Sequence, residues 1–191
     1  MRRLPPGPHG LPPELVERNQ RERLIAAMAE VAAERGYVEA SVAEVAKHAG
    51  VSTATFYRQF KDKRECMLVS FEALFGRLLE ALEGACEQWG NVESRAAEGA
   101  RFVGAILAED VPAARLLSIE ILSVGPNGVR VQHEAIERLA ALLRGPEAAA
   151  ALDAAWVGVA AMTSLVGRRL AEERLPDPDE LAALAEAAIL R

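Results

Sequence analysis

The segment SVAEVAKHAGVSTATFYRQFKDKREC, residues 41–66, constrains the fold more than any other part of the chain. Gly50 suits the left-handed position that follows a helix end, so it predicts a turn between two short helices. Helix-start signals precede three predicted helices: the capping box Ser41–Glu44, the N-cap Ser52, and the stretch that begins at Asp62. Two short helices joined by a turn of about three or four residues indicate a helix-turn-helix.

The second of these helices, residues 53–60, has two chemically different faces. Phe56 and Phe60 are four positions apart and are expected to pack against a preceding helix that carries Ile25, Met28 and Val31. The opposite face is polar and carries Thr53, Thr55, Tyr57, Arg58 and Gln59. Short hydroxyl side chains near the start of a helix can approach base edges closely, and longer polar side chains can reach bases or phosphates. The free backbone amides at the helix start can bind a phosphate. The pattern favours a helix that reads DNA, whereas any one signal alone is also typical of a solvated helical hairpin.

Charge is unevenly distributed along the chain. The whole chain has a net charge of −6, but residues 1–64 hold 11 basic against 8 acidic side chains, and residues 65–191 hold 11 against 20. All three lysines, Lys47, Lys61 and Lys63, lie in the first part. A local basic face on an acidic body favours contact with DNA phosphates, and an ordinary mixed surface is the alternative.

The rest of the chain predicts helices only. Alanine, leucine, glutamate and arginine dominate, with apolar residues at steps of three and four and no alternating β-branched stretch. Helix breakers predict about nine helices, with joints at Gly36, Gly50, Gly90-Asn91, Asp110–Pro112, Gly125–Gly128, Gly145-Pro146 and Pro176–Pro178. The expected organisation is all-α: a flexible arm at residues 1–17, a helix-turn-helix domain at 18–64, and a helical effector-binding and dimerisation domain at 65–191.

Residues 23–68 resemble the DNA-binding domain of the TetR family of regulators. The resemblance depends on Glu34-Arg35-Gly36-Tyr37, then Ala49-Gly50-Val51-Ser52, then Phe56-Tyr57-Arg58-Gln59-Phe60, and then Lys63. It covers about a quarter of the chain, and the remainder is similar to the family only in length and helical composition. The resemblance implies a dimer that binds a palindromic operator in double-stranded DNA through two recognition helices.

The resemblance also implies a role for each matching residue. Ser41 caps a helix and touches a phosphate, Tyr57 and Lys63 bind phosphates, and Ser52, Thr53 and Thr55 form the DNA-facing start of the recognition helix. Lys61 joins this basic face. Arg58 departs from many relatives, which carry histidine there, and either a phosphate or a guanine contact suits it. Because position 54 is alanine, base readout is expected to depend on Thr53, Thr55 and Arg58.

The larger domain is expected to hold an effector pocket with apolar walls and a few polar anchors. The candidate pocket residues are Phe71, Phe102, Ile106, Leu117, Glu120, His133 and Trp156. A filled core with polar residues at its edge is the alternative. The last two helices are rich in small and apolar residues, and by resemblance they form a four-helix interface with their copies. The candidate interface residues are Trp156, Val159, Met162, Val166, Leu181, Leu184 and Ala188.

These patterns predict a cytoplasmic DNA-binding regulator, a repressor released by a small hydrophobic or amphipathic effector. The alternative is a similar dimer without an effector, controlled by a protein partner or by expression level. No catalytic, cofactor or metal motif is recognised, so we expect neither an enzyme nor a cofactor. Neither a membrane span nor a secretory signal is expected. Cys66 and Cys86 lie about 30 Å apart if they share one helix, and buried inert thiols are expected rather than a redox sensor.

Overall fold

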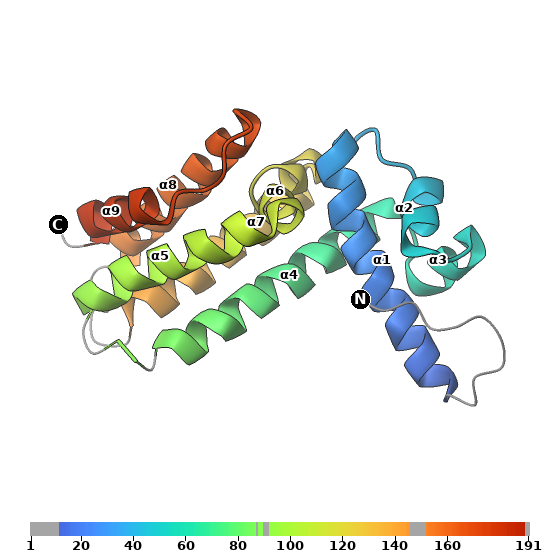
Figure 1. Cartoon of the computed structure of the whole chain (residues 1–191), viewed down its shortest axis with the longest axis horizontal. Helices are drawn as coiled ribbons and strands as arrows, with labels where there is room; N and C mark the ends of the chain where they lie inside the picture. The colour runs from blue at the N-terminus through green and yellow to red at the C-terminus, as the bar shows by residue number, and fades with distance from the viewer. Residues whose placement is uncertain (1–11, 87, 90–91, 146–151, 190–191) are drawn as a thin grey trace.

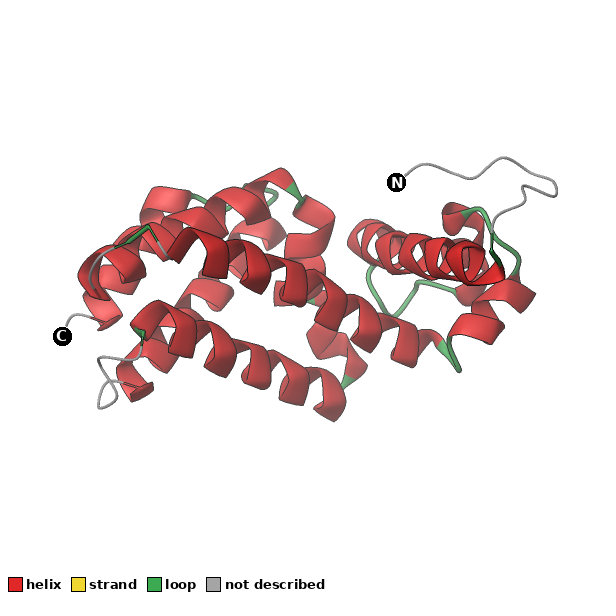
Figure 2. Ribbon diagram, turned by 90° about the horizontal axis from the view of Figure 1, so that it is seen from below, coloured by secondary structure: helices red, strands yellow, loops and turns green. Residues whose placement is uncertain are grey.

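The computed structural model describes residues 12–86, 88–89, 92–145 and 152–189, and over these residues the chain is helical with no strand (Figures 1 and 2). The helices are α1 (Pro13–Arg35), α2 (Val42–Ala49), α3 (Thr53–Gln59), α4 (Lys63–Cys86), α5 (Val92–Glu109), α6 (Val111–Ser118), the 3₁₀ helix η1 (Glu120–Val124), α7 (Pro126–Arg144), α8 (Leu152–Ala171) and α9 (Pro178–Ile189). The all-α prediction is therefore confirmed. No described helix is long and apolar enough to cross a membrane.

Helices α1–α3 form a head at one end of the molecule, and α5–α9 form a body at the other (Figure 1). Helix α4 belongs to both parts, because its first turns bury Cys66 and Met67 beside the head and its last turns bury Leu78 and Leu82 in the body. One continuous helix therefore joins the two parts of the molecule.

The core of the head forms around Phe56 of α3 and Phe60, the residue directly after this helix. Phe56 and Phe60 are 0% and 2% exposed, and their ring centroids lie 5.6 Å apart. They belong to the same buried cluster as Leu24 and Met28 of α1. Burying each aromatic side chain stabilises the fold by about 1.5–3 kcal/mol. The predicted inward face of α3 is confirmed.

The predicted caps form as the sequence indicates. The Ser41 hydroxyl accepts a hydrogen bond from the Glu44 amide, and the Glu44 carboxylate accepts one from the Ser41 amide. Gly50 has φ 63° and ψ 39°, the left-handed conformation that glycine adopts without steric cost. Asp62 accepts a hydrogen bond of 2.7 Å from the Glu65 amide at the start of α4. These local bonds fix where α2 and α4 begin and where α2 ends.

Two boundaries differ from the prediction. Residues 13–17, assigned to the arm, form the first turn of α1, because Pro13 occupies a position where the helix needs no N–H donor. The 3₁₀ helix η1 was not predicted, since a short apolar stretch before Gly125 carries no capping signal of its own. The predicted joints at Gly90-Asn91 and Pro146 lie outside the described residues.

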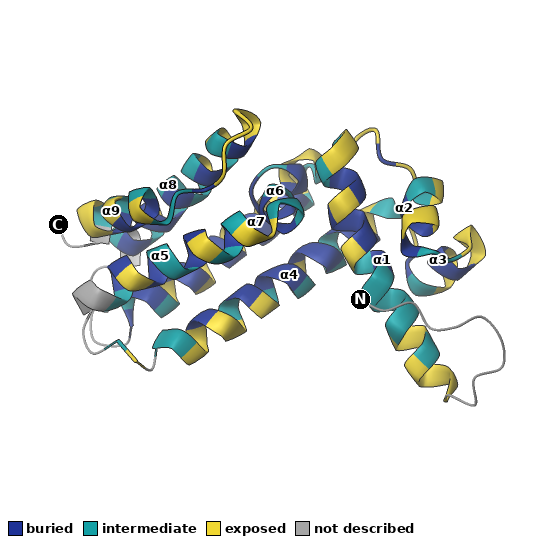
Figure 3. Ribbon diagram, viewed as in Figure 1, coloured by how far each residue is buried: buried dark blue, intermediate teal, exposed yellow. Residues whose placement is uncertain are grey.

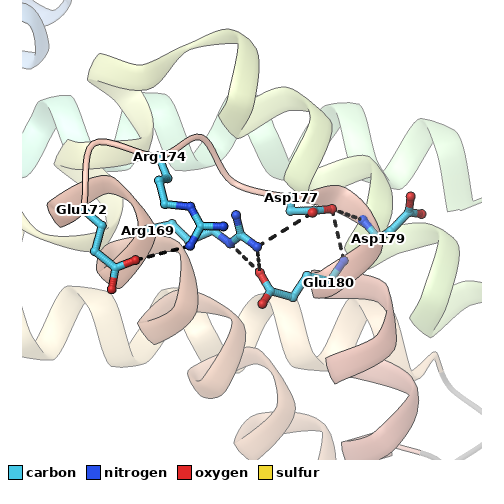
Figure 4. Close-up of polar contacts among 6 residues, drawn as sticks. All are labelled: Arg169, Glu172, Arg174, Asp177, Asp179 and Glu180. Carbon is cyan, nitrogen blue, oxygen red and sulfur yellow. Dashed lines mark hydrogen bonds and ion pairs between the residues drawn. The ribbon is translucent and has the colours of Figure 1, made fainter.

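Helices α8 and α9 form a hairpin whose turn is held by ion pairs (Figure 4). Arg169 of α8 pairs with Glu180 of α9 and with Asp177, whose carboxylate lies 3.8 Å away. Arg174 lies 3.6 Å from Glu172 within the same turn. Arg169 is mostly buried, so these contacts fix the packing of α9 on α8, and α9 in turn covers α5.

Candidate DNA-binding surface and effector cavity

Helix α3 presents an exposed face at the end of the head (Figure 3). Thr53, Ala54, Tyr57 and Arg58 are exposed, and Tyr57, at 58%, is among the most exposed large hydrophobic residues that the structure describes. The Tyr57 ring packs edge-on against the buried Phe56 ring, with centroids 5.5 Å apart. The Tyr57 ring therefore packs on the buried core of the head through Phe56, while more than half of the residue stays exposed.

Thr55 does not belong to this exposed face. It is 8% exposed, and its hydroxyl lies 3.0 Å from the Ser52 hydroxyl and accepts a 3.2 Å hydrogen bond from Arg58. The Ser52 hydroxyl in turn accepts from the Thr55 amide at 3.0 Å. The prediction that Thr55 points outward is wrong, because this residue completes the N-cap and steers the Arg58 guanidinium instead.

Lys63 is engaged within the head. Its ammonium donates to the carbonyls of Tyr37, Val38 and Ala40 at 2.8, 3.0 and 2.7 Å, and it lies 4.5 Å from the centre of the Tyr37 ring. Three carbonyls use all three N–H donors of a lysine. The prediction of a phosphate contact by Lys63 conflicts with this geometry, which assigns the residue to the turn between α1 and α2. Lys61, by contrast, is exposed.

Two arginines of α1 position the helix-turn-helix and were not singled out by the sequence. Arg21 donates to the Gln59 carbonyl at 2.7 Å and stacks 4.5 Å from the Phe60 ring centre. Arg23 donates to the carbonyl of Gly50 at 2.9 Å. Both contacts hold backbone carbonyls at the ends of α2 and α3. No local sequence signal marks them, because the partners lie far along the chain.

The body contains a small apolar cavity of about 50 Å³. Its walls come from α4–α9, and only Ser118, Gln132 and Thr163 contribute polar side chains. The cavity is lined by Phe71, Phe75, Leu78, Val103, Leu107, Leu117, Ser118, Gln132, Ala135, Ile136, Leu139, Val159, Met162, Thr163, Val166 and Leu181. Of the predicted pocket residues, Phe71 and Leu117 are among them.

The other predicted pocket residues lie elsewhere. Phe102 packs edge-on against Trp89, with centroids 6.1 Å apart, and Ile106 is half-buried outside the cavity wall. His133 is exposed and packs edge-on against Trp156, with centroids 5.6 Å apart. Each of these side chains is on a helix face next to the face that lines the cavity. The apolar pattern of the sequence alone does not determine how each helix is rotated about its axis.

Glu120, the remaining predicted pocket residue, bridges the body and the head instead. It is 5% exposed, and its carboxylate accepts a 2.8 Å hydrogen bond from the Tyr37 amide in the turn after α1. Arg115 donates to the same carboxylate at 3.4 Å and to the Leu170 carbonyl of α8 at 3.2 Å. The buried charge is therefore paired and hydrogen-bonded on both sides, as burial requires.

Gln132 connects the cavity to this bridge. Its amide donates to the carbonyls of Leu117 and Ser118 at 3.1 and 3.4 Å, and all three residues line the cavity. These carbonyls end α6, directly before η1 and Glu120. Gln132 is therefore bonded to the end of α6, close to the 3₁₀ helix η1 that begins with Glu120.

Four of the predicted interface residues are covered by their own protomer. Val159, Met162, Val166 and Leu181 are at most 3% exposed and line the cavity, so their assignment to a dimer interface is wrong. The small-residue pattern of α8 and α9 serves packing within the chain at these positions. Trp156, Leu184 and Ala188 are half-buried, and Val157, which was not predicted, is 56% exposed on α8.

Burial raises the pKa of the Cys66 thiol to about 12, so this thiol stays protonated at neutral pH. Burial also raises the pKa of Cys86. A thiolate is the reactive form in redox chemistry, so these environments favour inert thiols. Within the described residues, no three His, Cys, Asp or Glu side chains are grouped to hold a metal ion.

Comparison with known proteins matches the head to a family. Residues 24–69 match the family described as bacterial regulatory proteins, tetR family. The fatty acid metabolism regulator protein of Bacillus subtilis (strain 168) is 38% identical over 61 residues, which cover 32% of this chain and 31% of that protein. The similarity in sequence is thus confined to about a third of that relative.

The fold of the whole chain is similar to solved regulators. The fatty acid degradation regulator FadR of Bacillus halodurans gives a TM-score of 0.72 at 20% identity, with coverage of 90% of this chain and 94% of that one. The transcriptional regulator FadR of Bacillus subtilis, solved in complex with stearoyl-CoA, gives 0.68 at 19% identity, with coverage of 88% and 95%. At these identities the similarity concerns the fold alone.

Proposed function

We propose that the chain, whose residues 24–69 match the tetR family of bacterial regulatory proteins and whose fold is similar to solved regulators, is a homodimeric repressor released from a palindromic operator by an amphipathic acyl compound. The observation that carries the DNA-binding part is the exposed face of α3, with Thr53, Tyr57 and Arg58 outward on the buried Phe56 and Phe60. A rigid helix with hydroxyl, phenol and guanidinium groups at its tip suits the major groove.

Each exposed group has a role in the proposed complex. Thr53 stands at the start of α3 and approaches a base edge or a phosphate. Tyr57 and Lys61 contact phosphates, and Ser41 adds a contact from the start of α2. Arg58, steered along the helix by Thr55, reaches a guanine or a phosphate. Lys63 supports these contacts indirectly by holding the turn that precedes α2.

The proposed dimer joins α8 and α9 of one protomer to those of its partner. The support is the apolar surface left on α8, where Val157 is exposed and Trp156 is half-buried beside His133. Leu184 and Ala188 are half-buried apolar residues of α9, the helix that packs against α8. Such a dimer carries two recognition helices at a fixed separation, and a palindrome matches that two-fold symmetry.

The effector class is supported by the apolar lining of the cavity and by the stearoyl-CoA bound to the related Bacillus subtilis regulator. The cavity of about 50 Å³ is far smaller than a ligand pocket, which spans roughly 300–1,000 Å³. An acyl chain would therefore have to push the walls apart. A ligand that binds the opened body more tightly than the closed one shifts the protein toward the opened state.

We further propose that this opening reaches the head through Gln132, the end of α6 and Glu120. Gln132 is bonded to the carbonyls that precede η1, and Glu120 is bonded to the Tyr37 amide. The Tyr37 carbonyl is in turn held by Lys63 at the start of α4. A change in the cavity wall thus has a bonded route to the turn that sets the position of α2 and α3.

A second candidate is a regulator of the same fold without a small effector, controlled by a protein partner or by its own concentration. The observation that favours it is the nearly filled cavity. Binding of a true effector to the folded state raises the melting temperature by mass action, so a thermal-shift series with acyl compounds separates the two candidates.

The experiment that tests the proposed function begins with selection of bound fragments from random double-stranded DNA. We expect an enriched palindrome, a complex with two chains per site, and release of the DNA on addition of stearoyl-CoA. Failure to enrich any sequence would contradict the DNA-binding function. If a palindrome is enriched, but acyl compounds neither release the DNA nor raise the melting temperature, the result would support the second candidate.

A further inference from the structure

The start of α5 and the end of α7 lie at the end of the body that is opposite to α3 (Figure 1), and each carries an arginine, Arg95 and Arg144, with buried nitrogens that no described residue partners. Arg95 of α5 and Arg144 of α7 line the same shallow depression, which has a volume of about 470 Å³. Arg95 Nη1 and Arg144 Nε and Nη1 are buried from solvent, and the described residues offer them no hydrogen-bond partner. Glu83 lines the depression as well, and no described ion pair joins it to either arginine. Both arginines are half-buried as residues, and an anion in the depression would supply the negative charge that no described ion pair gives them.

The depression and the apolar cavity lie along the same helices. On α5, Val103 lines the cavity and Arg95 lines the depression, eight residues or about 12 Å apart. On α4 the corresponding residues are Leu78 and Cys86. On α7, Leu139 lines the cavity and Arg144 the depression.

A short apolar plug separates the two spaces. Gly99 lies midway between Arg95 and Val103, and the side chains of Leu82, Leu143 and Trp89 surround it so closely that a Cβ there would overlap Leu143. The plug is made of side chains rather than backbone, and both leucines are fully buried, so a ligand has to displace packed side chains to pass it. A ligand that rests on the arginines and extends past Leu82 and Leu143 would enter the cavity.

We propose that Arg95 and Arg144 bind the anionic head group, a phosphate or a carboxylate, of the amphipathic effector whose acyl chain opens the cavity. This inference rests on the proposed acyl effector and adds its head-group site. Arginine suits both anions because its planar fork donates two parallel hydrogen bonds to a pair of oxygens. The head group binds in the open depression, and the acyl chain of the effector occupies the space that the side chains of the plug fill in the free protein. The site lies far from α3, so the anion does not compete with DNA phosphates for the same residues.

The test measures affinity for stearoyl-CoA, stearate, free coenzyme A and uncharged stearyl alcohol by titration calorimetry on the full chain. The variants are Arg95→Gln, Arg144→Gln and their double, together with Arg144→Lys. Arg130→Gln is the matched control, because it removes one positive charge from an exposed position on the same helix as Arg144. We expect each glutamine to weaken binding of the anionic acyl ligand by about tenfold, since hydrogen bonds to charged groups contribute about that much. We expect Arg130→Gln and all measurements with stearyl alcohol to change by less than about twofold.

The two anionic ligands identify the head group. Loss of stearoyl-CoA binding with stearate unchanged assigns the arginines to phosphate, and loss of both assigns them to any anion at the end of an acyl chain. Equal affinity of wild type and the double variant for both ligands would refute the head-group site and leave the acyl effector standing. No binding of any acyl ligand to the wild type would refute both, while operator binding by the same sample would preserve the DNA-binding function.

Melting temperature of the free protein gives a second readout. Because the described residues give the buried nitrogens of these arginines no partner, we expect the glutamine variants to melt at the same temperature as the wild type or above it. A structural role for either arginine would instead lower the melting temperature. Such a decrease, with acyl affinity unchanged, would overturn the proposal.

Discussion

The head and the body of this chain satisfy their polar groups to different extents. In the head, the Ser41–Glu44 capping box is reciprocal, Ser52 and Thr55 bond to each other, and Lys63 holds three carbonyls. In the body, Arg95 and Arg144 keep buried N–H groups without a described partner, and an apolar cavity remains among α4–α9. Among the described residues the head leaves one buried polar atom without a partner, Gln20 Oε1, whereas the body leaves four on Arg95, Arg115 and Arg144, together with the space of the cavity.

This difference indicates a division of labour. A surface that reads DNA must hold its side chains at fixed positions before binding, because ordering them later costs affinity. A sensor must have two states of similar free energy, and a fully satisfied core would favour one of them too strongly. The Glu120 bridge lies where the two requirements meet, since it is buried in the body and bonded to the head.

Among the tests of this difference between head and body, Phe56→Ala has the largest expected effect. Phe56 is 0% exposed in the core of the head, so the substitution should cost about 3–5 kcal/mol of unfolding free energy. We expect loss of operator binding, while the body keeps its helical content in circular dichroism. Phe102→Ala is the matched control, because Phe102 is half-buried in the body and outside the cavity wall. Equal loss of operator binding in both variants would mean that head and body are not separable in this way.

The next test concerns the bridge. Glu120→Ala removes the acceptor of the Tyr37 amide and the partner of Arg115, and we expect a cost of about 2–3 kcal/mol, because Arg115 is partly exposed. We also expect operator binding that no longer responds to stearoyl-CoA. Glu120→Gln keeps an acceptor for the amide and should retain part of the response. A normal response in Glu120→Ala, measured by DNA release, would contradict the proposed route.

The sequence predicted most of the head because the signals there are local. A capping box, a left-handed glycine and two phenylalanines four apart each involve residues within a few positions, and all were confirmed. The errors in the head concern contacts over a longer range. Lys63 bonds the carbonyls of residues 37, 38 and 40, and Arg21 bonds the Gln59 carbonyl, so neither role is visible in a short window of sequence.

In the body the sequence predicted helices but not which face each one buries. Val159, Met162, Val166 and Leu181 have the composition of an interface and line the cavity instead, because an apolar stripe is the same whether it packs within one chain or between two. Glu120 was expected near a ligand, and its partner Tyr37 is 83 residues away. Such pairings depend on how the helices assemble.

A smaller effect is expected for Tyr57→Phe, which removes only the phenol oxygen from an exposed ring. The Phe56 contact that positions the ring stays intact, so the melting temperature should not change. If the hydroxyl donates to a phosphate, operator affinity should fall by about tenfold, the contribution of a hydrogen bond to a charged group. Fluorescence anisotropy at fixed salt measures it. Unchanged affinity would remove Tyr57 from the DNA interface.

The two lysines that follow α3 separate residues that contact DNA from residues that hold the head in shape. Lys61 is exposed, so Lys61→Ala should reduce the salt dependence of operator binding by about 0.9 in the log–log slope and leave stability unchanged. Lys63→Ala should instead lower the melting temperature, because it frees three carbonyls in the turn after α1. The slope for this variant should match wild type. If Lys63→Ala instead reduced the salt dependence and left the melting temperature unchanged, Lys63 would be a phosphate ligand.

The smallest expected effect concerns the capping box at the start of α2. Hydrogen bonds from the Ser41 hydroxyl and amide lower the pKa of Glu44 below its ordinary value. A carboxylate whose folded-state pKa is depressed stabilises the fold above its unfolded-state pKa, and this contribution disappears as the pH falls through the folded-state pKa. Glu44→Gln should therefore lower the melting temperature slightly at neutral pH and flatten the acid limb of the stability curve. Glu39→Gln, at an exposed position before α2, is the control and should leave that limb unchanged. If both variants give the same curve as wild type, the capping carboxylate does not contribute to the rigidity of the head, and the contrast with the body depends on Lys63 and the α3 cap alone.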